Sequence, residues 1–153
     1  MNWKWARRLV NFWPPLFFTG IKATSISEDF RRIEVVLKRR FHTRNMVGTQ
    51  FGGSLFAMTD PWYMMMLTYN LGRDYFVWDK SAHIDFIAPG RTAVKAEFSL
   101  DDATLERIRE HTADGKKYLP NFAVDIVDEH GHLVARVRRT IYVRAKPHRR
   151  PGS

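Results

Sequence analysis

The chain has 153 residues, of which 44% are hydrophobic and 14% aromatic, so it is long and apolar enough to fold around one core. It has no cysteine, which excludes disulfides, thiolate catalysis and cysteine-ligated zinc and agrees with a cytoplasmic location. The formal net charge of +9 fits an anionic partner: nucleic acid, an acidic membrane surface, or a phosphorylated small molecule such as coenzyme A.

Residues 1–23 predict an amphipathic helix followed by a connector. Pro14-Pro15 ends the helix, and no small-residue cleavage site follows, which argues against a signal peptide. The helix lies either over the domain's own core, over a partner subunit, or in the interface plane of a membrane as a peripheral contact. Its apolar side chains recur at helical spacing: Trp5, Leu9, Phe12 and Trp13.

Thr24 to Arg40 predicts extended structure, because Ile33, Val35 and Leu37 alternate with polar residues at the period of a half-buried strand. A loop from His42 to Gln50 follows.

Gly52 to Leu71 predicts a long core helix that is buried all round, since apolar residues occupy nearly every side. Asp60, Pro61 and Asn70 interrupt the apolar run, which argues against a membrane-spanning helix. Pro61 lacks an N–H and disfavours helical geometry at Asp60, so the helix should kink or restart there.

The rest of the chain predicts antiparallel strands with a short inserted helix. Asp101 or Asp102 caps that helix, and the last two strands form a hairpin. The resulting fold class is α+β: one long central helix wrapped by a curved antiparallel sheet, forming one domain over residues 24–146, followed by a basic tail over 147–153. The predicted strands are Tyr75–Trp78 with Ala82–Ile87 (one strand or two), Val94–Leu100, Phe122–Ile126 and Leu133–Val143.

The stretch from Asn45 to Asp60 carries the chemistry. A polar turn leads into Gly52 and Gly53, and two glycines at the mouth of a helix leave backbone N–H groups free for a carbonyl oxygen or an oxyanion. Asp60 is the only ionisable group in the apolar segment that follows. Burying such a carboxylate is costly unless it is hydrogen-bonded or takes part in a reaction.

These residues resemble the hotdog-fold thioesterases, and the resemblance covers roughly Thr24 to Val143. The branch is that of phenylacetic-acid-degradation and human acyl-CoA thioesterases, in which an asparagine, a histidine-glycine-glycine and a helix aspartate form the site. Asn45, Phe51-Gly52-Gly53 and Asp60 occupy these positions at the same spacing. Asn45 to Asp60 and the run from Val77 to Ser81 are more similar still to a bacterial hotdog group without an assigned activity.

The resemblance implies a homodimer, or a dimer of dimers, with edge-to-edge sheets and an acyl-CoA or other acyl thioester site at the interface. The amides of Gly52 and Gly53 would bind the carbonyl oxygen, and Asp60 would activate water or attack the thioester carbon. Asn45 would orient water or substrate. Coenzyme A would enter as part of the substrate, with no further cofactor and no metal. Substrate contacts would come from Gln50, Phe51, Trp78, Lys80 and Ser81.

Alternatives remain open on the sequence alone. Asp60 is equally suited to be the N-cap of a helix that begins at Pro61. Phe51 stands where the family has histidine, which motivates a non-catalytic protein that binds an acyl-CoA or fatty acyl group. An enoyl-CoA hydratase or dehydratase is a further alternative, although it would need a histidine beside the carboxylate, and His83 is the only one on a predicted strand near the site.

Three further features of the sequence bear on its function. His130 and His132 lie at a turn without other ligands, so they do not predict a metal site. Nucleic acid is disfavoured as a partner because the aromatic residues fall in apolar stretches or in the N-terminal helix. Arg136, Arg138 and Arg139 either meet the phosphates of coenzyme A or form the solvated face of the last strand.

Overall fold

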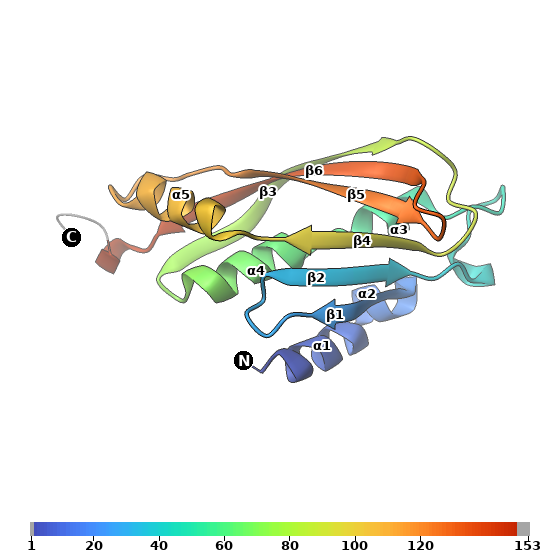
Figure 1. Cartoon of the computed structure of the whole chain (residues 1–153), viewed down its shortest axis with the longest axis horizontal. Helices are drawn as coiled ribbons and strands as arrows, with labels where there is room; N and C mark the ends of the chain where they lie inside the picture. The colour runs from blue at the N-terminus through green and yellow to red at the C-terminus, as the bar shows by residue number, and fades with distance from the viewer. Residues whose placement is uncertain (1, 150–153) are drawn as a thin grey trace.

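Six antiparallel strands form one curved sheet in the computed structural model, which describes residues 2–149 (Figure 1). The helices and strands are α1 (Trp3–Phe12), α2 (Pro14–Thr19), β1 (Ile21–Ile26), β2 (Arg32–Leu37), α3 (Gly52–Ala57), α4 (Trp62–Leu71), β3 (Tyr75–Phe86), β4 (Val94–Ser99), α5 (Asp102–Thr112), β5 (Asn121–Asp128) and β6 (Leu133–Ala145). Short 3-10 turns, η1 (Phe41–Thr43) and η2 (Pro147–Arg149), complete the described chain. The α+β layout is therefore confirmed. Of the predicted basic tail, residues 150–153 lie outside the described residues.

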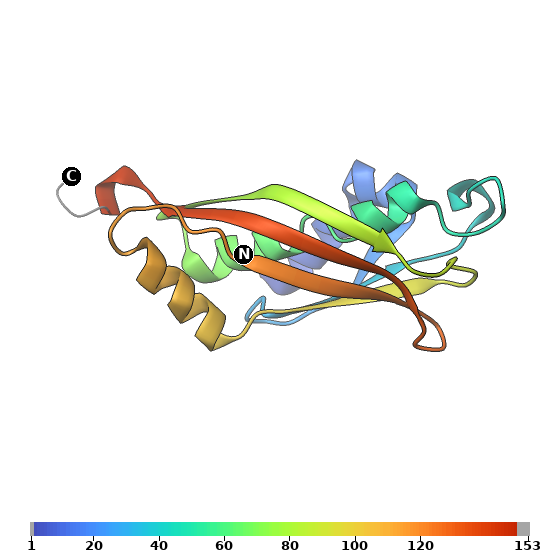
Figure 2. The same ribbon diagram turned by 90° about the horizontal axis from the view of Figure 1, so that it is seen from above.

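The strand order is β1-β2-β4-β5-β6-β3, so β1 and β3 are the edges of the sheet. The long pairing of β3 with β6 runs from Tyr75 opposite Ala145 to Phe86 opposite Ala135, with a bulge between Asp79 and Ser81. The predicted alternatives for this region are thus resolved as one bulged strand. Seen from above, the sheet is strongly twisted, and α3 and α4 lie behind it (Figure 2).

Period-two patterning decides which side chains of the strands enter the core. Ile33, Val35 and Leu37 of β2 are buried, as the alternation predicts. The stretch predicted as extended is in fact two strands, because the chain turns between Ile26 and Arg32. Phe30 in this turn has a φ of 55° and is fully buried against Tyr69, with ring centroids 4.0 Å apart.

Helix α4 fills the concave side of the sheet. Trp62 and Met66 are fully buried, and the ring of Tyr63 lies between Phe98 and Phe122, with centroids at 5.3 and 4.3 Å. Burial raises the pKa of Tyr63 to about 12, so its hydroxyl stays protonated and donates to the carbonyl of Ala123. The helix is not buried all round, however. Thr68 and Tyr69 are exposed because α4 packs against a sheet with only one side.

The central helix restarts at Asp60-Pro61, as predicted. Helix α3 ends at Ala57 and α4 begins at Trp62, and the Asp60-Pro61 peptide bond is cis. The alternative in which Asp60 caps the second helix is excluded, because α4 has no side-chain cap. The carboxylate of Asp60 points instead to a basic side chain of β6.

Helix α1 lies along β1, while Pro14 and Pro15 begin a second short helix (Figure 1). Ala6 is buried in the contact. Asn11 bonds to both backbone groups of Ala23, accepting its N–H at 2.8 Å and donating to its carbonyl at 3.0 Å. Arg7 donates to the carbonyl of Thr24. Within residues 2–149, no helix is both long enough and apolar enough to cross a bilayer.

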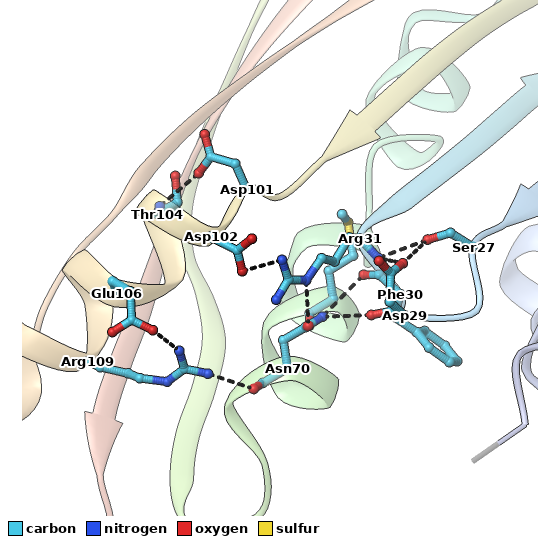
Figure 3. Close-up of polar contacts among 11 residues, drawn as sticks. Ser27, Asp29, Phe30, Arg31, Asn70, Asp101, Asp102, Thr104, Glu106 and Arg109 are labelled. Atoms are coloured by element: carbon cyan, nitrogen blue, oxygen red, sulfur yellow. Dashed lines mark hydrogen bonds and ion pairs between the residues drawn. The ribbon is translucent and has the colours of Figure 1, made fainter.

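Asn70 ties the end of α4 to the turn between β1 and β2 (Figure 3). Its side-chain amide donates to the carbonyls of Met66, Asp29 and Phe30 at 2.9, 3.2 and 3.4 Å. Its side-chain oxygen accepts from Arg31 at 3.2 Å. Arg31 also pairs with Asp102 at the start of α5, where Asp101 is the N-cap, so one amide connects three elements.

We expect Asn70→Ala to lower the free energy of unfolding by about 1–2 kcal/mol, because partly buried carbonyls and a guanidinium lose their partner. Chemical denaturation monitored by circular dichroism measures this. Thr68→Ala, an exposed change in the same helix, is the control and should shift stability by less than about 0.5 kcal/mol. Equal effects of the two changes would contradict a structural role for Asn70.

Candidate functional site

The loop from Asn45 to Gln50 is held by its own side chains. Asn45 accepts from the N–H groups of Val47 and Thr49 at 3.2 and 3.0 Å and donates to the Thr49 hydroxyl at 2.8 Å. Gly48 has a φ of 81°, which few other residues adopt. The side chain of Asn45 therefore builds the turn, and all of its described hydrogen bonds are local.

Gln50 anchors this loop to the sheet. Its side chain is buried, and its amide donates to the carbonyls of Leu37 and Thr92 at 3.3 and 3.1 Å. Gly90 is needed opposite, because a Cβ there would lie 2.9 Å from Gln50 Cγ. The Oε1 atom of Gln50 is buried and has no partner among the described residues.

The two glycines at the start of α3 sit under aromatic rings. A Cβ on Gly53 would lie 2.5 Å from the ring of Phe51, and a Cβ on Gly52 would lie 3.1 Å from the ring of Phe86. Phe51 is the N-cap residue, and its ring is 55% exposed. The N–H groups of Gly52 and Gly53 have no hydrogen-bond acceptor within residues 2–149. They are two donors that a carbonyl oxygen could use.

An open hollow of about 370 Å³ lies at this helix start. It brings Asn45, Gln50 and Gly52 together, as the sequence predicts, but Asp60 does not line it. Polar side chains share its wall with the apolar side chains of Leu55, Phe86, Ile87 and Pro89.

Asp60 belongs to a second group, built around Arg139 of β6. The Arg139 side chain is only 4% exposed, and its guanidinium donates to Asp79 at 2.8 Å and to Asp60 at 3.3 Å. It also donates to the buried hydroxyl of Thr59 at 3.1 and 3.2 Å and lies 5.5 Å from the ring centroid of Phe56. The apolar residues around Asp60 in the sequence suggest a buried carboxylate, but the structure does not place Asp60 in an apolar pocket. Its side chain is 53% exposed.

The remaining predicted residues lie on β3 beside this group. Trp78 stacks on Tyr142 at 4.0 Å and is half exposed. Lys80 and Ser81 lie at the bulge and are exposed, and neither side chain bonds to a described residue. Asp79, between Trp78 and Lys80, pairs with Arg139. Among residues 2–149, no three histidine, aspartate or glutamate side chains gather as metal ligands would.

The sequence predicts the same environment for Arg139 as for Arg136 and Arg138: the solvated face of the last strand, or contact with the phosphates of coenzyme A. Arg136 and Arg138 are indeed exposed and pair with Asp125 and Asp85, but Arg139 is buried. The alternation along β6 indicates this burial, because Arg139 lies on the same face of the strand as the buried Val137 and Ile141.

We expect Arg139→Met to lower the free energy of unfolding by about 3 kcal/mol, because two carboxylates and a buried hydroxyl lose their common partner. Arg138→Met, the adjacent exposed arginine, is the control and should cost less than about 1 kcal/mol. Urea denaturation measures the unfolding midpoints of both variants. Similar midpoints would show that Arg139 does not hold the α3–α4 junction.

Solved structures share this fold at low sequence identity. A Pseudomonas aeruginosa protein of unknown function, described as a probable thioesterase, is 16% identical with a TM-score of 0.84, over 95% of this chain and 97% of its own. A Haemophilus influenzae thioesterase is 17% identical with a TM-score of 0.69, over 97% and 95%. The Escherichia coli PaaI protein of the phenylacetic acid degradation operon is 16% identical with a TM-score of 0.62, over 94% and 93%.

These similarities confirm the hotdog fold and the resemblance to thioesterase-like proteins of the phenylacetic-acid-degradation type. Among curated proteins, none matches the sequence significantly. The sequence from residue 2 to 143 matches the family described as "Domain of unknown function (DUF4442)". The chain belongs to this family of hotdog-fold proteins.

Proposed function

We propose that the protein hydrolyses an acyl thioester, with coenzyme A as the carrier and no further cofactor. The observation that carries this proposal is that the N–H groups of Gly52 and Gly53 have no acceptor within residues 2–149 and lie at the hollow lined by Asn45, Gln50 and several apolar side chains. Backbone donors at such a position stabilise the negative charge that develops on a thioester oxygen during attack.

The reaction needs one group to accept a proton. Asp60 would take a proton from a water molecule while the oxygen of that water bonds to the thioester carbon. Collapse of the resulting oxyanion would break the C–S bond, and the thiolate would leave with that proton. Direct attack by Asp60, followed by hydrolysis, is the covalent variant. Asn45 would orient water or substrate, and Phe51 and Gln50 would contact the acyl thioester.

Within a single chain, the Gly52 donor and Asp60 lie apart. Helix α3 has six residues and rises about 9 Å, with Gly52 at its start and Asp60 beyond its end. The two groups are also spaced along β3, where Phe86 contacts Gly52 and Asp79 shares Arg139 with Asp60. A second copy that pairs its β3 antiparallel, about a two-fold axis at His83, would place Asp79 opposite Phe86 of the partner subunit, because the bulge between Asp79 and Ser81 adds one residue to that half of the strand.

Two features support pairing through β3. The opposite edge of the sheet is blocked, because Asn11 and Arg7 occupy backbone groups of β1 at Ala23 and Thr24. Near the hollow, large apolar side chains stay exposed, as expected of a surface that another subunit covers: Met46, Val47, Phe51, Phe86 and Ile87. The proposed assembly is a homodimer, which could pair further into a dimer of dimers. Trp78, Lys80 and Ser81 would then lie close to the partner's hollow.

We expect Asp60→Asn to reduce turnover of acyl-CoAs by at least about 100-fold, because the amide cannot accept the proton. Free-thiol release from short, medium, long and aromatic acyl-CoAs measures this. Asp125→Asn, which removes a carboxylate from an exposed ion pair on β5, is the control and should keep the wild-type rate. Equal rates for Asp60→Asn and the wild type, with the dimer intact, would remove Asp60 from the reaction.

We expect His83→Glu to convert the dimer into monomers, because the two-fold axis would set the two new carboxylates directly opposite each other. Light scattering at micromolar concentration measures the mass. Ala123→Glu adds the same charge to an exposed position of the interior strand β5 and should leave the dimer intact. A wild-type monomer would contradict the interface model.

A second candidate function is binding of an acyl-CoA or fatty acyl group without hydrolysis. Two observations favour it: Phe51 replaces the polar residue of the family motif, and Arg139 already pairs with Asp60. Tight acyl-CoA binding with no thiol release over the whole panel would establish it. A hydratase has less support, since His83 bonds to Asp85 on the exposed strand instead of to Asp60.

A further inference from the structure

The N-terminal helices expose an apolar surface that the fold does not use. Helix α1 buries Ala6 against β1 and turns its other side outward. The exposed fractions range from 47% for Trp13 to 73% for Phe12 and Phe18. We call this set the N-terminal apolar surface: Trp5, Leu9, Phe12, Trp13, Phe17 and Phe18. A contiguous exposed set of this kind marks an interaction site.

This surface carries only positive charge along its own segment. The first acidic residue of the sequence is Glu28, whereas Lys4, Arg7, Arg8 and Lys22 all precede it. None of these four cations forms an ion pair within residues 2–149. Lys4 and Arg8, one turn apart, flank the outward stripe of Trp5, and Arg8 lies 5.7 Å from the Trp5 ring centroid.

A hollow of about 640 Å³ lies between this surface and the sheet edge. Basic side chains from three elements line it, together with the rings of Phe12, Phe17 and Phe18: Arg7, Arg8, Lys22, Lys38 and Arg40. Cations beside exposed aromatic rings suit a ligand that is anionic at one end and apolar at the other. The phospholipids of an anionic bilayer have this chemistry.

A second copy of the chain fits this surface poorly. In a symmetric dimer the same patch faces itself, so the unpaired cations of the two copies would oppose each other without intervening acids. A membrane surface instead supplies many negative charges and an apolar layer directly below them. The charge of the patch therefore selects the bilayer over self-association.

We propose that α1 and α2 dock the protein onto anionic membranes, with the rings of the N-terminal apolar surface inserted at the headgroup level. Lys4 and Arg8 contact lipid phosphates, and the basic hollow accepts a headgroup. The proposal does not depend on the thioesterase activity, because the surface lies along β1 and the candidate site borders β3, at the opposite edge of the sheet (Figure 1).

Co-sedimentation of the full chain with vesicles tests this directly. We expect binding to phosphatidylcholine vesicles that contain phosphatidylglycerol and little binding to pure phosphatidylcholine. The charge reversal Lys4→Glu/Arg8→Glu should lower the partition coefficient by about 30-fold or more. Lys116→Glu/Lys117→Glu changes the net charge equally at an exposed turn far along the chain, and should keep most of the binding.

A second double variant tests the contribution of the aromatic rings to membrane binding. Phe12→Ser/Phe18→Ser keeps every charge and should weaken vesicle binding by about 10-fold or more, with an unchanged circular dichroism spectrum. Absence of wild-type binding to anionic vesicles would overturn the proposal, as would equal losses in the two charge-reversed variants. Loss of self-association in Phe12→Ser/Phe18→Ser, without any vesicle binding by the wild type, would assign the surface to a second copy instead.

Discussion

The buried guanidinium of Arg139 is the constraint on which the candidate site depends. A cation that is almost fully removed from water needs compensation for its lost hydration. Asp79, Asp60 and the hydroxyl of Thr59 provide that compensation from β3 and from the α3–α4 junction. The same contacts tie the interruption of the central helix, which Pro61 causes, to β3 and β6. The position of Asp60 is therefore a consequence of charge burial on a neighbouring strand and not of helix capping.

This constraint also explains why Asp60 is half exposed in a single chain. Arg139 draws the carboxylate toward β3, away from the hollow at the start of α3. The donor of Gly52 then lies at the start of α3, near Phe86 of β3, whereas Asp60 lies beyond the end of α3 and shares Arg139 with Asp79 of β3. In the proposed dimer, a two-fold axis would bring the Gly52 donor of one chain toward Asp60 of the other, so each chain would supply half of each of two sites.

Local periodicity was enough to predict most of the fold. Alternation identified β2, β4, β5 and β6, the Asp101 cap placed α5, and the proline rule located the restart before α4. The environment of Asp60 could not be predicted in this way. It depends on Arg139, which is 79 positions away along the sequence and reaches Asp60 only because β6 and β3 pair. The alternation of β6 places Arg139 on the inner face, but only the sheet's curvature shows that Asp60 and Asp79 meet it there.

The two edges of the sheet are treated in opposite ways, and this difference orders the whole molecule. An uncovered strand offers unpaired backbone groups to any other strand. Along β1, Asn11 satisfies both backbone groups of Ala23, and Arg7 satisfies the carbonyl of Thr24. A strand therefore cannot add to β1 there without displacing α1. The edge at β3 has no such cover within residues 2–149, and it carries Asp79 and the neighbours of the hollow. The proposed dimer therefore uses the β3 edge, which holds the candidate site, while α1 and α2 at the other edge are left for the proposed membrane contact.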